Sequence, residues 1–177
     1  SEGHLGSGHH SGNVCVNVAI EIDHFTRQTF ESSEDAVDWA LGILSAVSEV
    51  YEEEVNISIV SDYAFVWGVE DPYNLYVEQS TDMLYSIKDK WNMDPTFSGV
   101  ERDLVHLFTK RENTGTGGIA FVNGAGNINY GYGFSSSLTS DMEYADVPAP
   151  FFHWNLLVVS HEIGHNFGSM HTQWCGW

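Results

Sequence analysis

Apolar and polar positions follow two periods along the chain, and these periods predict alternating strands and helices. Alternation at every second position over residues 14–23 predicts a strand. Apolar residues three and four apart predict a helix that Ser32 or Ser33 caps and that ends near residue 53. Its expected apolar stripe consists of Ala36, Val37, Ala40, Leu41, Leu44, Val47 and Val50.

The middle of the chain continues this alternation. Residues 55–66 predict a second strand, and residues 80–91 predict a second helix with Ser80 or Thr81 as its cap. The apolar run 104–109 suits a buried strand, in which His106 is expected to be a core side chain. Residues 123–137 are rich in turn formers and lack the lysine of a phosphate-binding loop.

The last predicted element is a helix over about residues 152–167, which Pro148 and Pro150 precede. One side carries Trp154, Leu157 and Val158, and the other side carries Leu156, Val159, Ile163 and Phe167. Because it is apolar nearly all round, we expect this helix to be central and buried.

Composition limits the class of protein. A chain of 177 residues with 42% hydrophobic and 14% aromatic residues suits one folded domain. We expect a flexible leader over residues 1–12 and a single domain over residues 13–177. The formal net charge of −19 argues against nucleic acids and anionic membranes as partners, and no apolar run reaches the roughly 20 residues of a membrane helix. Cys15 and Cys175 permit one disulfide without requiring it.

The strongest chemical signal is the segment SHEIGHNFGSMH at residues 160–171. On a helix, His161 and His165 project from one face, so both imidazoles can bind one metal ion. Glu162 lies beside that ion without binding it. Gly168 can end the helix in a left-handed conformation, which would bring His171 back as a third ligand.

Three histidine ligands leave one tetrahedral position open for water, which is typical of a catalytic zinc site rather than a structural one. Ordinary helix histidines are the alternative for a bare H-E-x-x-H. The glycine and third histidine, both at the required spacing, strongly disfavour that alternative.

This segment resembles the zinc-binding signature of the metzincin zinc endopeptidases, and HEIGHNFG is most similar to the adamalysin (reprolysin) branch and its bacterial relatives. The resemblance implies an α/β (α+β) fold, the metzincin upper subdomain. Its mixed, mostly parallel twisted sheet has two scaffold helices and a buried active-site helix. It also implies one catalytic Zn²⁺, protein or peptide substrates, and secretion.

The segment GGIAFVNG resembles the family's edge strand, which pairs with an extended peptide. On that resemblance Gly118, Ile119, Ala120 and Phe121 would bind substrate, although an ordinary hairpin explains the pattern equally well. Asp103 corresponds loosely to a calcium ligand of adamalysins. Its expected partner position holds Asn17 instead of Glu, so Ca²⁺ is the weaker of the two metal predictions.

The resemblance has a gap after His171, where metzincins continue into a methionine-bearing turn beneath the zinc. Neither Met142 nor Met170 is placed to replace it, and Thr172 stands where adamalysins typically have Asp. We therefore expect the lower subdomain to be missing or to lie on another chain, and a C-terminal fragment carrying the turn is a candidate partner.

The residues and the resemblance together predict a secreted zinc-dependent endopeptidase with Glu162 as general base. A catalytically silent, protein-binding module of the same fold is the main alternative, which an absent lower wall would favour. A non-proteolytic metal carrier is a third, and the open coordination position disfavours it.

Overall fold

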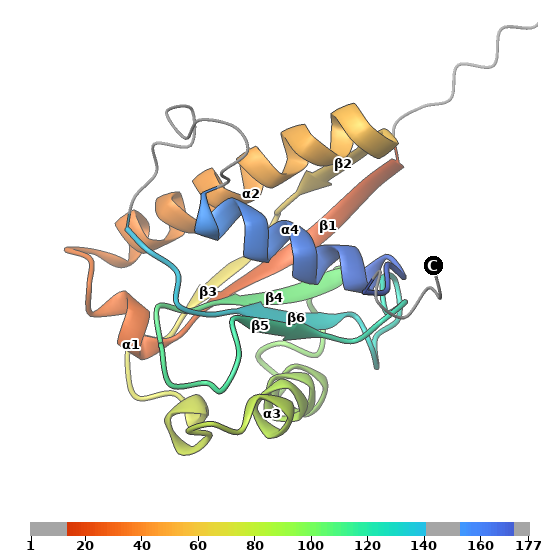
Figure 1. Ribbon diagram of the computed structural model, residues 1–177. Helices are drawn as coiled ribbons and strands as arrows, with labels where there is room; N and C mark the ends of the chain where they lie inside the picture. The colour runs from red at the N-terminus through yellow and green to blue at the C-terminus, as the bar shows by residue number, and fades with distance from the viewer. Residues whose placement is uncertain (1–13, 141–152, 172–177) are drawn as a thin grey trace, which may run out of the picture.

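A mixed sheet of six strands forms the centre of the computed structural model, which describes residues 14–140 and 153–171 (Figure 1). The strands are β1 (Val14–Ile22), β2 (Ile57–Val60), β3 (Ala64–Val66), β4 (Leu104–Phe108), β5 (Gly118–Ala120) and β6 (Tyr132–Ser135). Their order is β2-β1-β4-β6-β5, with β3 also paired to β1. All pairs are parallel except β5 with β6, so the predicted mostly parallel α/β sheet is confirmed.

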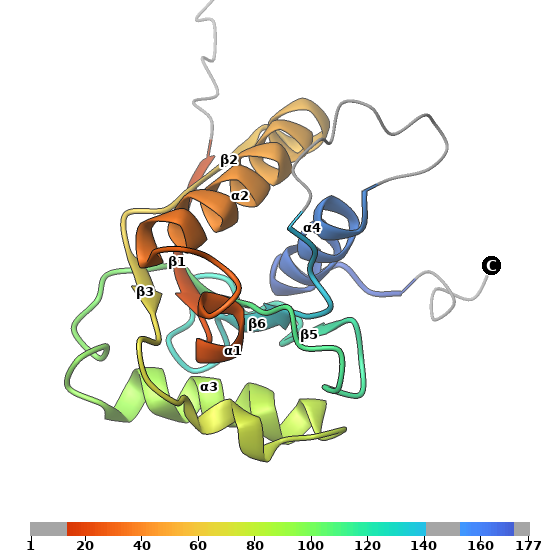
Figure 2. The ribbon, with the colours of Figure 1, turned by 90° about the vertical axis from the view of Figure 1, so that its left-hand side faces the viewer.

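Helices cover both faces of this sheet (Figures 1 and 2). One face carries α2 (Ser33–Val55) and α4 (Trp154–Asn166), and the opposite face carries α3 (Ser80–Met93). The short helix α1 (His24–Arg27) lies between β1 and α2, and the 3₁₀ helix η1 (Pro72–Leu75) lies between β3 and α3. Helices on both faces are what a mostly parallel sheet requires, because its strands are then buried on each side.

The alternation in β1 produces two separate cores. Val16, Val18, Ile20 and Ile22 belong to the core under α2 and α4, whereas Ala19 belongs to the core on the α3 side. Because successive side chains of a strand point to opposite faces, a single central strand contributes to both cores.

The predicted start of α2 is correct, but its buried apolar stripe is rotated about the helix axis relative to the prediction. Ser32 caps the helix through a reciprocal capping box with Asp35. Trp39 and Ile43 are buried although the prediction left them out, whereas Val50 is 39% exposed. The stripe is rotated because α2 packs against both the sheet and α4.

Two other sequence predictions were wrong in detail, and one strand was not predicted. The strand over residues 55–66 is two short strands, β2 and β3, separated where Asp62 donates its backbone N–H to the Asn17 side chain. Ser80 is the first residue of α3, and the N-cap Gln79 makes no side-chain hydrogen bond. The turn-rich stretch contains β6, which lies between β4 and β5.

Helix α4 is central but not wholly buried. Val159 and Ile163 are buried against α2 and the sheet, while Trp154 is 39% exposed and Leu157 is 49% exposed. The apolar outer face is therefore a wall of a cleft, which corrects the expectation of burial on all sides.

Several predictions concern residues outside the described ranges: the leader 1–12, Met142, the prolines 148 and 150, Thr172 and Cys175. In the described part of the chain, no helix combines the length and apolar character needed to cross a bilayer.

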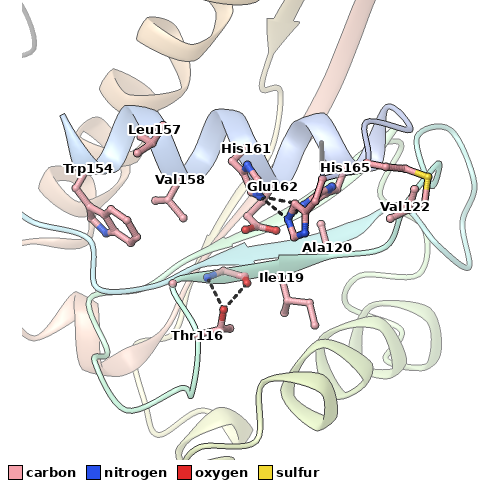
Figure 3. Close-up of a pocket in the computed structure, with 14 residues that line it drawn as sticks. Thr116, Ile119, Ala120, Val122, Trp154, Leu157, Val158, His161, Glu162 and His165 are labelled. Carbon is pink, nitrogen blue, oxygen red and sulfur yellow. Dashed lines mark hydrogen bonds between the residues drawn. The ribbon is translucent and has the colours of Figure 1, made fainter. Parts of the chain in front are cut away.

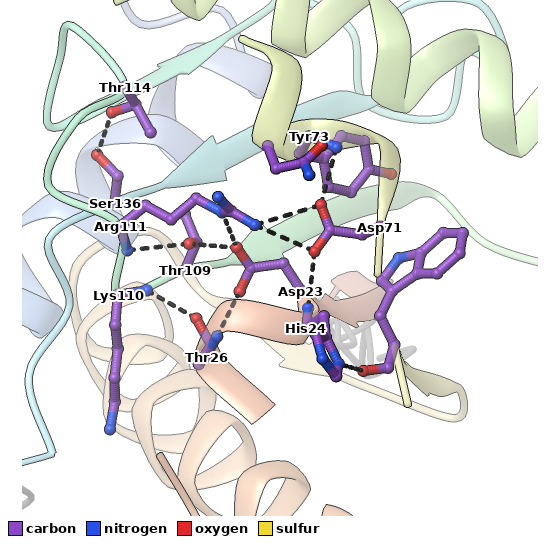
Figure 4. Close-up of polar contacts among 12 residues, drawn as sticks. Asp23, His24, Thr26, Asp71, Tyr73, Thr109, Lys110, Arg111, Thr114 and Ser136 are labelled. Carbon is purple, nitrogen blue, oxygen red and sulfur yellow. Dashed lines mark hydrogen bonds and ion pairs between the residues drawn. The ribbon is translucent and has the colours of Figure 1, made fainter. Parts of the chain in front are cut away.

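A buried ion-pair network fixes the loop that leads into β5 (Figure 4). Arg111 donates from Nε to Asp23 Oδ2 at 2.6 Å and from Nη2 to Asp71 Oδ2 at 3.2 Å. Asp23 also accepts from the Thr109 hydroxyl at 2.8 Å and caps α1 through the Thr26 N–H. The start of the 111–117 segment is thereby tied to the ends of β1 and β4.

Candidate active site

The end of α4 is shaped by Gly168, which has a φ of 99°. Its N–H donates to His165 O at 2.8 Å, and the Ser169 N–H donates to Gly164 O at 2.9 Å. This pair of bonds is the Schellman arrangement, in which a left-handed glycine reverses the chain after a helix. The reversal brings His171 beside the two histidines on the helix.

The three histidines converge on one point. The Nε2 atom of His161 lies 3.0 Å from that of His165 and 3.1 Å from that of His171, and the last pair is also 3.1 Å apart. Neutral imidazoles cannot satisfy three mutual contacts of this kind by hydrogen bonding alone, because each Nε2 has one in-plane direction. Three convergent imidazole nitrogens are a donor set that suits Zn²⁺. No other group of three such ligand residues occurs within residues 14–140 and 153–171.

The surroundings of His161 and His165 also suit a cation. His165 Nδ1 lies 2.7 Å from Ser169 O, which can only accept, so Nδ1 carries the proton and Nε2 of the neutral ring keeps its lone pair. Partial burial of its ring, with the neighbouring imidazoles of His165 and His171, lowers the pKa of His161 even though the residue as a whole is exposed. Neutral imidazole is the form that binds metal.

Glu162 lies between the histidines and the edge of the sheet (Figure 3). The residue is 5% exposed, and Oε2 has no hydrogen-bond partner among the residues that the structure describes. Burial raises the pKa of Glu162 to about 7, so the carboxyl group can both accept and release a proton near neutral pH. A Cβ on Gly118 would lie 2.6 Å from Glu162 Cγ, so only glycine allows this approach.

A cleft of about 460 Å³ joins the histidines, Glu162 and β5. Along α4 its wall is apolar, with Trp154, Leu157 and Val158, and Met170 adds to it beyond the helix. The Trp154, Val158 and Glu162 side chains of α4 point toward β5 (Figure 3). Trp154, Leu157 and Val158, which the sequence pattern placed together on one side of the helix, therefore lie on the side of the three histidines.

The opposite wall is the open edge of the sheet. The backbone groups of Gly117 and Phe121 form hydrogen bonds with residues of the β6 side. Successive residues of an antiparallel strand direct their backbone N–H and C=O groups to opposite sides, so those of Gly118 and Ala120 point away from β6 and toward the open edge. The Thr116 hydroxyl donates to Gly118 O at 2.9 Å and accepts the Gly118 N–H at 3.4 Å (Figure 3). Of the four predicted substrate residues, Gly118, Ile119 and Ala120 line the cleft.

Phe121 differs from the other three predicted substrate residues. Its ring, like the Ile119 side chain, packs with the core on the α3 side. It meets Tyr85 and Tyr130 edge-on at centroid distances of 5.4 Å and 5.6 Å. Phe121 is thus a structural support of the edge rather than part of the cleft lining.

Two residues that contact the open edge or its loop escaped the sequence analysis. Thr116 lies in a glycine-rich loop, and Asn166 lies inside the histidine segment without a role in the metal pattern. Asn166 is 1% exposed and bonds to carbonyls of the segments around β5 and β6. These contacts join distant parts of the chain, so no local pattern predicts them.

The calcium prediction finds no support. Asp103 Oδ2 accepts the backbone N–H of Asn17 at 2.8 Å, and the Asn17 amide donates to Asp62. These polar groups are therefore used to join β1 to its neighbours. His106 is a core side chain as predicted, with Nε2 2.9 Å from Ser135 Oγ, and burial lowers its pKa to about 3.

Comparisons with known proteins agree with this geometry. The family model for the reprolysin-like metallopeptidases of family M12B matches residues 41–172. Among solved structures, metalloproteinase-II from Bacteroides fragilis has 11% sequence identity and a TM-score of 0.55 over 93% of this chain. A structure described as a chaperone-substrate complex has 12% identity and a TM-score of 0.60 over 90% of this chain.

These two structures support the fold only, because their identities are low. The chain spans 45% of the Bacteroides fragilis protein and 25% of the chain in the chaperone-substrate complex. No curated protein matches the sequence. The family model covers most of the chain, including the three histidines and Glu162, and so the chain belongs to the reprolysin-like metallopeptidases of family M12B.

Proposed function

We propose that this chain is the zinc-binding part of a secreted endopeptidase that hydrolyses peptide bonds in proteins. The observation that carries the proposal is the convergence of three imidazole Nε2 atoms beside a buried carboxyl group and an open strand edge in one cleft. His161, His165 and His171 would hold the ion. Membership of a zinc-dependent peptidase family supports the same conclusion.

Zinc, when bound, would supply Lewis acidity, which polarises a carbonyl and lowers the pKa of water from about 15.7 towards about 7. Glu162 accepts a proton from the attacking water and then delivers a proton to the nitrogen of the leaving amine. The raised pKa of Glu162 suits both transfers. Water adds its oxygen to the carbonyl carbon, the C–N bond breaks, and no covalent bond to the protein forms.

The substrate would bind as an extended strand along β5. The outward backbone groups of Gly118 and Ala120 provide the hydrogen bonds, in the manner of strand addition to a sheet edge. Such bonds depend little on side-chain identity, so specificity would come from the apolar wall with Trp154 and Leu157. The Thr116 hydroxyl, which contacts Gly118 O, would be displaced when the substrate strand binds.

Secretion is the part of this proposal that the family resemblance alone supports.

Metal dependence of peptide hydrolysis tests the proposed function. A fluorogenic eight-residue peptide should be cleaved by the protein, lose cleavage on chelation, and regain it with one equivalent of zinc. His161→Ala should abolish both zinc uptake and cleavage, whereas His106→Asn, a change in the core, should leave zinc uptake unchanged. Zinc-loaded wild-type protein that cleaves no peptide would favour the catalytically silent binding module instead.

A further inference from the structure

The C-terminal end of α4 is bound directly to the strand edge of the cleft. The side-chain amide of Asn166 donates from Nδ2 to Phe121 O at 3.0 Å and to Tyr132 O at 3.1 Å. Tyr132 O also accepts the Phe121 N–H at 3.1 Å, which continues the β5–β6 pairing. One amide thus joins the histidine helix to both chains of the antiparallel pair at the point where β5 ends.

Backbone bonds of the following loop reinforce this junction. The Asn123 N–H donates to His165 O at 2.8 Å, and the Ala125 N–H donates to Asn166 O at 3.0 Å. The first of these carbonyls belongs to one of the three converging histidines. A Cβ on Gly124 would lie 1.8 Å from Tyr130 O, so the loop can take this path only with glycine there. Helix end, loop and strand edge therefore form one connected unit.

The chemistry of this junction requires an amide at position 166. Both acceptors are backbone carbonyls, so the side chain at this position must donate two hydrogen bonds. The carboxylate of Asp has no donor, and its oxygens would be repelled by the two carbonyl oxygens. Asn166 is 1% exposed, and its Oδ1 has no partner among the residues that the structure describes. Only the donors of this side chain are used, so its role is to hold the two elements together.

We propose that Asn166 is a positioning residue that sets the distance and register between the zinc-binding histidines and the substrate strand. The inference rests on the proposed function, because it assigns β5 to substrate binding. A peptide long enough to pair with Gly118 and Ala120 is cleaved efficiently only when this strand edge is correctly placed relative to the histidines. A peptide too short to pair along β5 depends mainly on the histidines and Glu162.

The test compares peptides of eight and four residues that share one scissile bond. Asn166→Asp should lower kcat/KM for the longer peptide about 10- to 100-fold, as expected for a small misplacement of substrate. The shorter peptide should lose less than about threefold, and bound zinc should stay at one per chain. If Asn166→Asp does not fold, Asn166→Ala removes the donors without adding charge. It should also lower the ratio of kcat/KM for the longer peptide to kcat/KM for the shorter one.

Asn155 provides a matched control at the other end of α4. It is fully buried, accepts the Thr139 N–H at 2.9 Å and donates to Thr139 O at 3.0 Å. Asn155→Asp should lower the stability of the protein without changing the ratio of the two rates. Equal losses for both peptides in the Asn166 variant, or the same change in the Asn155 variant, would overturn the positioning role.

Amide hydrogen exchange tests the junction without any activity. In the metal-free protein, Asn166→Asp should accelerate exchange of the Asn123 and Ala125 amides at least tenfold, and Asn155→Asp should not. Unchanged exchange at both amides would refute the role of Asn166 in holding this junction together. Accelerated exchange in a protein that never cleaves peptides would support that role and contradict the proposed endopeptidase activity.

Discussion

Replacing the buried carboxyl group of Glu162 with an amide should stabilise the metal-free protein, and the gain should grow with pH. The folded protein raises the pKa of Glu162 from 4.5 to about 7 through burial. Because the folded pKa is the higher one, the stability linked to this group is fully present below pH 4.5 and is lost as pH rises through 7. Glu162→Gln does not titrate and escapes this loss.

The two pKa values set the size of the effect. One pKa unit corresponds to about 1.4 kcal/mol, so ionised Glu162 costs the folded state about 3 kcal/mol at pH 8 and about 1.4 kcal/mol at pH 5.5. The advantage of Glu162→Gln over wild type should therefore increase by about 2 kcal/mol between these pH values. The cost of burying the uncharged amide is the same at both pH values, so it does not change this increase.

Urea denaturation with a chelator present measures this difference directly. The free energy of unfolding would be determined for wild type and Glu162→Gln at pH 5.5 and pH 8. Glu53→Gln removes the same charge from an exposed position on α2 and controls for the net charge. An advantage that is equal at the two pH values, or that shrinks at pH 8, would refute the assigned cost of burying this carboxylate.

Three further substitutions test the cleft and the core. Gly118→Ala should keep zinc but lower kcat/KM at least tenfold, because its Cβ collides with Glu162; steady-state kinetics with zinc analysis will decide. Thr116→Val should lower KM for long peptides about two- to tenfold by removing a competing hydrogen bond, and a higher KM would show that the hydroxyl assists binding. Glu21→Gln should destabilise the protein by about 2 kcal/mol in urea, since its NH₂ group would face a donor such as Trp91 Nε1; unchanged stability would contradict this.

Local signals in the sequence were sufficient for the start of α2 and for the histidine geometry. Ser32 and Asp35 form their capping box within one turn, and His161 and His165 share a face because of the helix period alone. The left-handed conformation of Gly168 follows from the absence of a Cβ. Each of these features depends on residues close in the chain, which is why the pattern predicts them.

Features that depend on distant partners were missed. The break between β2 and β3 coincides with hydrogen bonds between Asp62 and Asn17, which are far apart in sequence. The donors of Asn166 and the close approach of Gly118 to Glu162 likewise arise only when α4 packs against β5. The local pattern of apolar and polar residues does not predict such tertiary contacts.

The central claim is that Glu162 transfers protons at a zinc ion held by three histidines. Zinc content and peptide turnover measured on the same samples of wild type and Glu162→Ala test it most directly. The account predicts one zinc per chain in both proteins and turnover at least about 10²-fold lower in the variant. A variant that keeps its zinc and cleaves at the wild-type rate would contradict it.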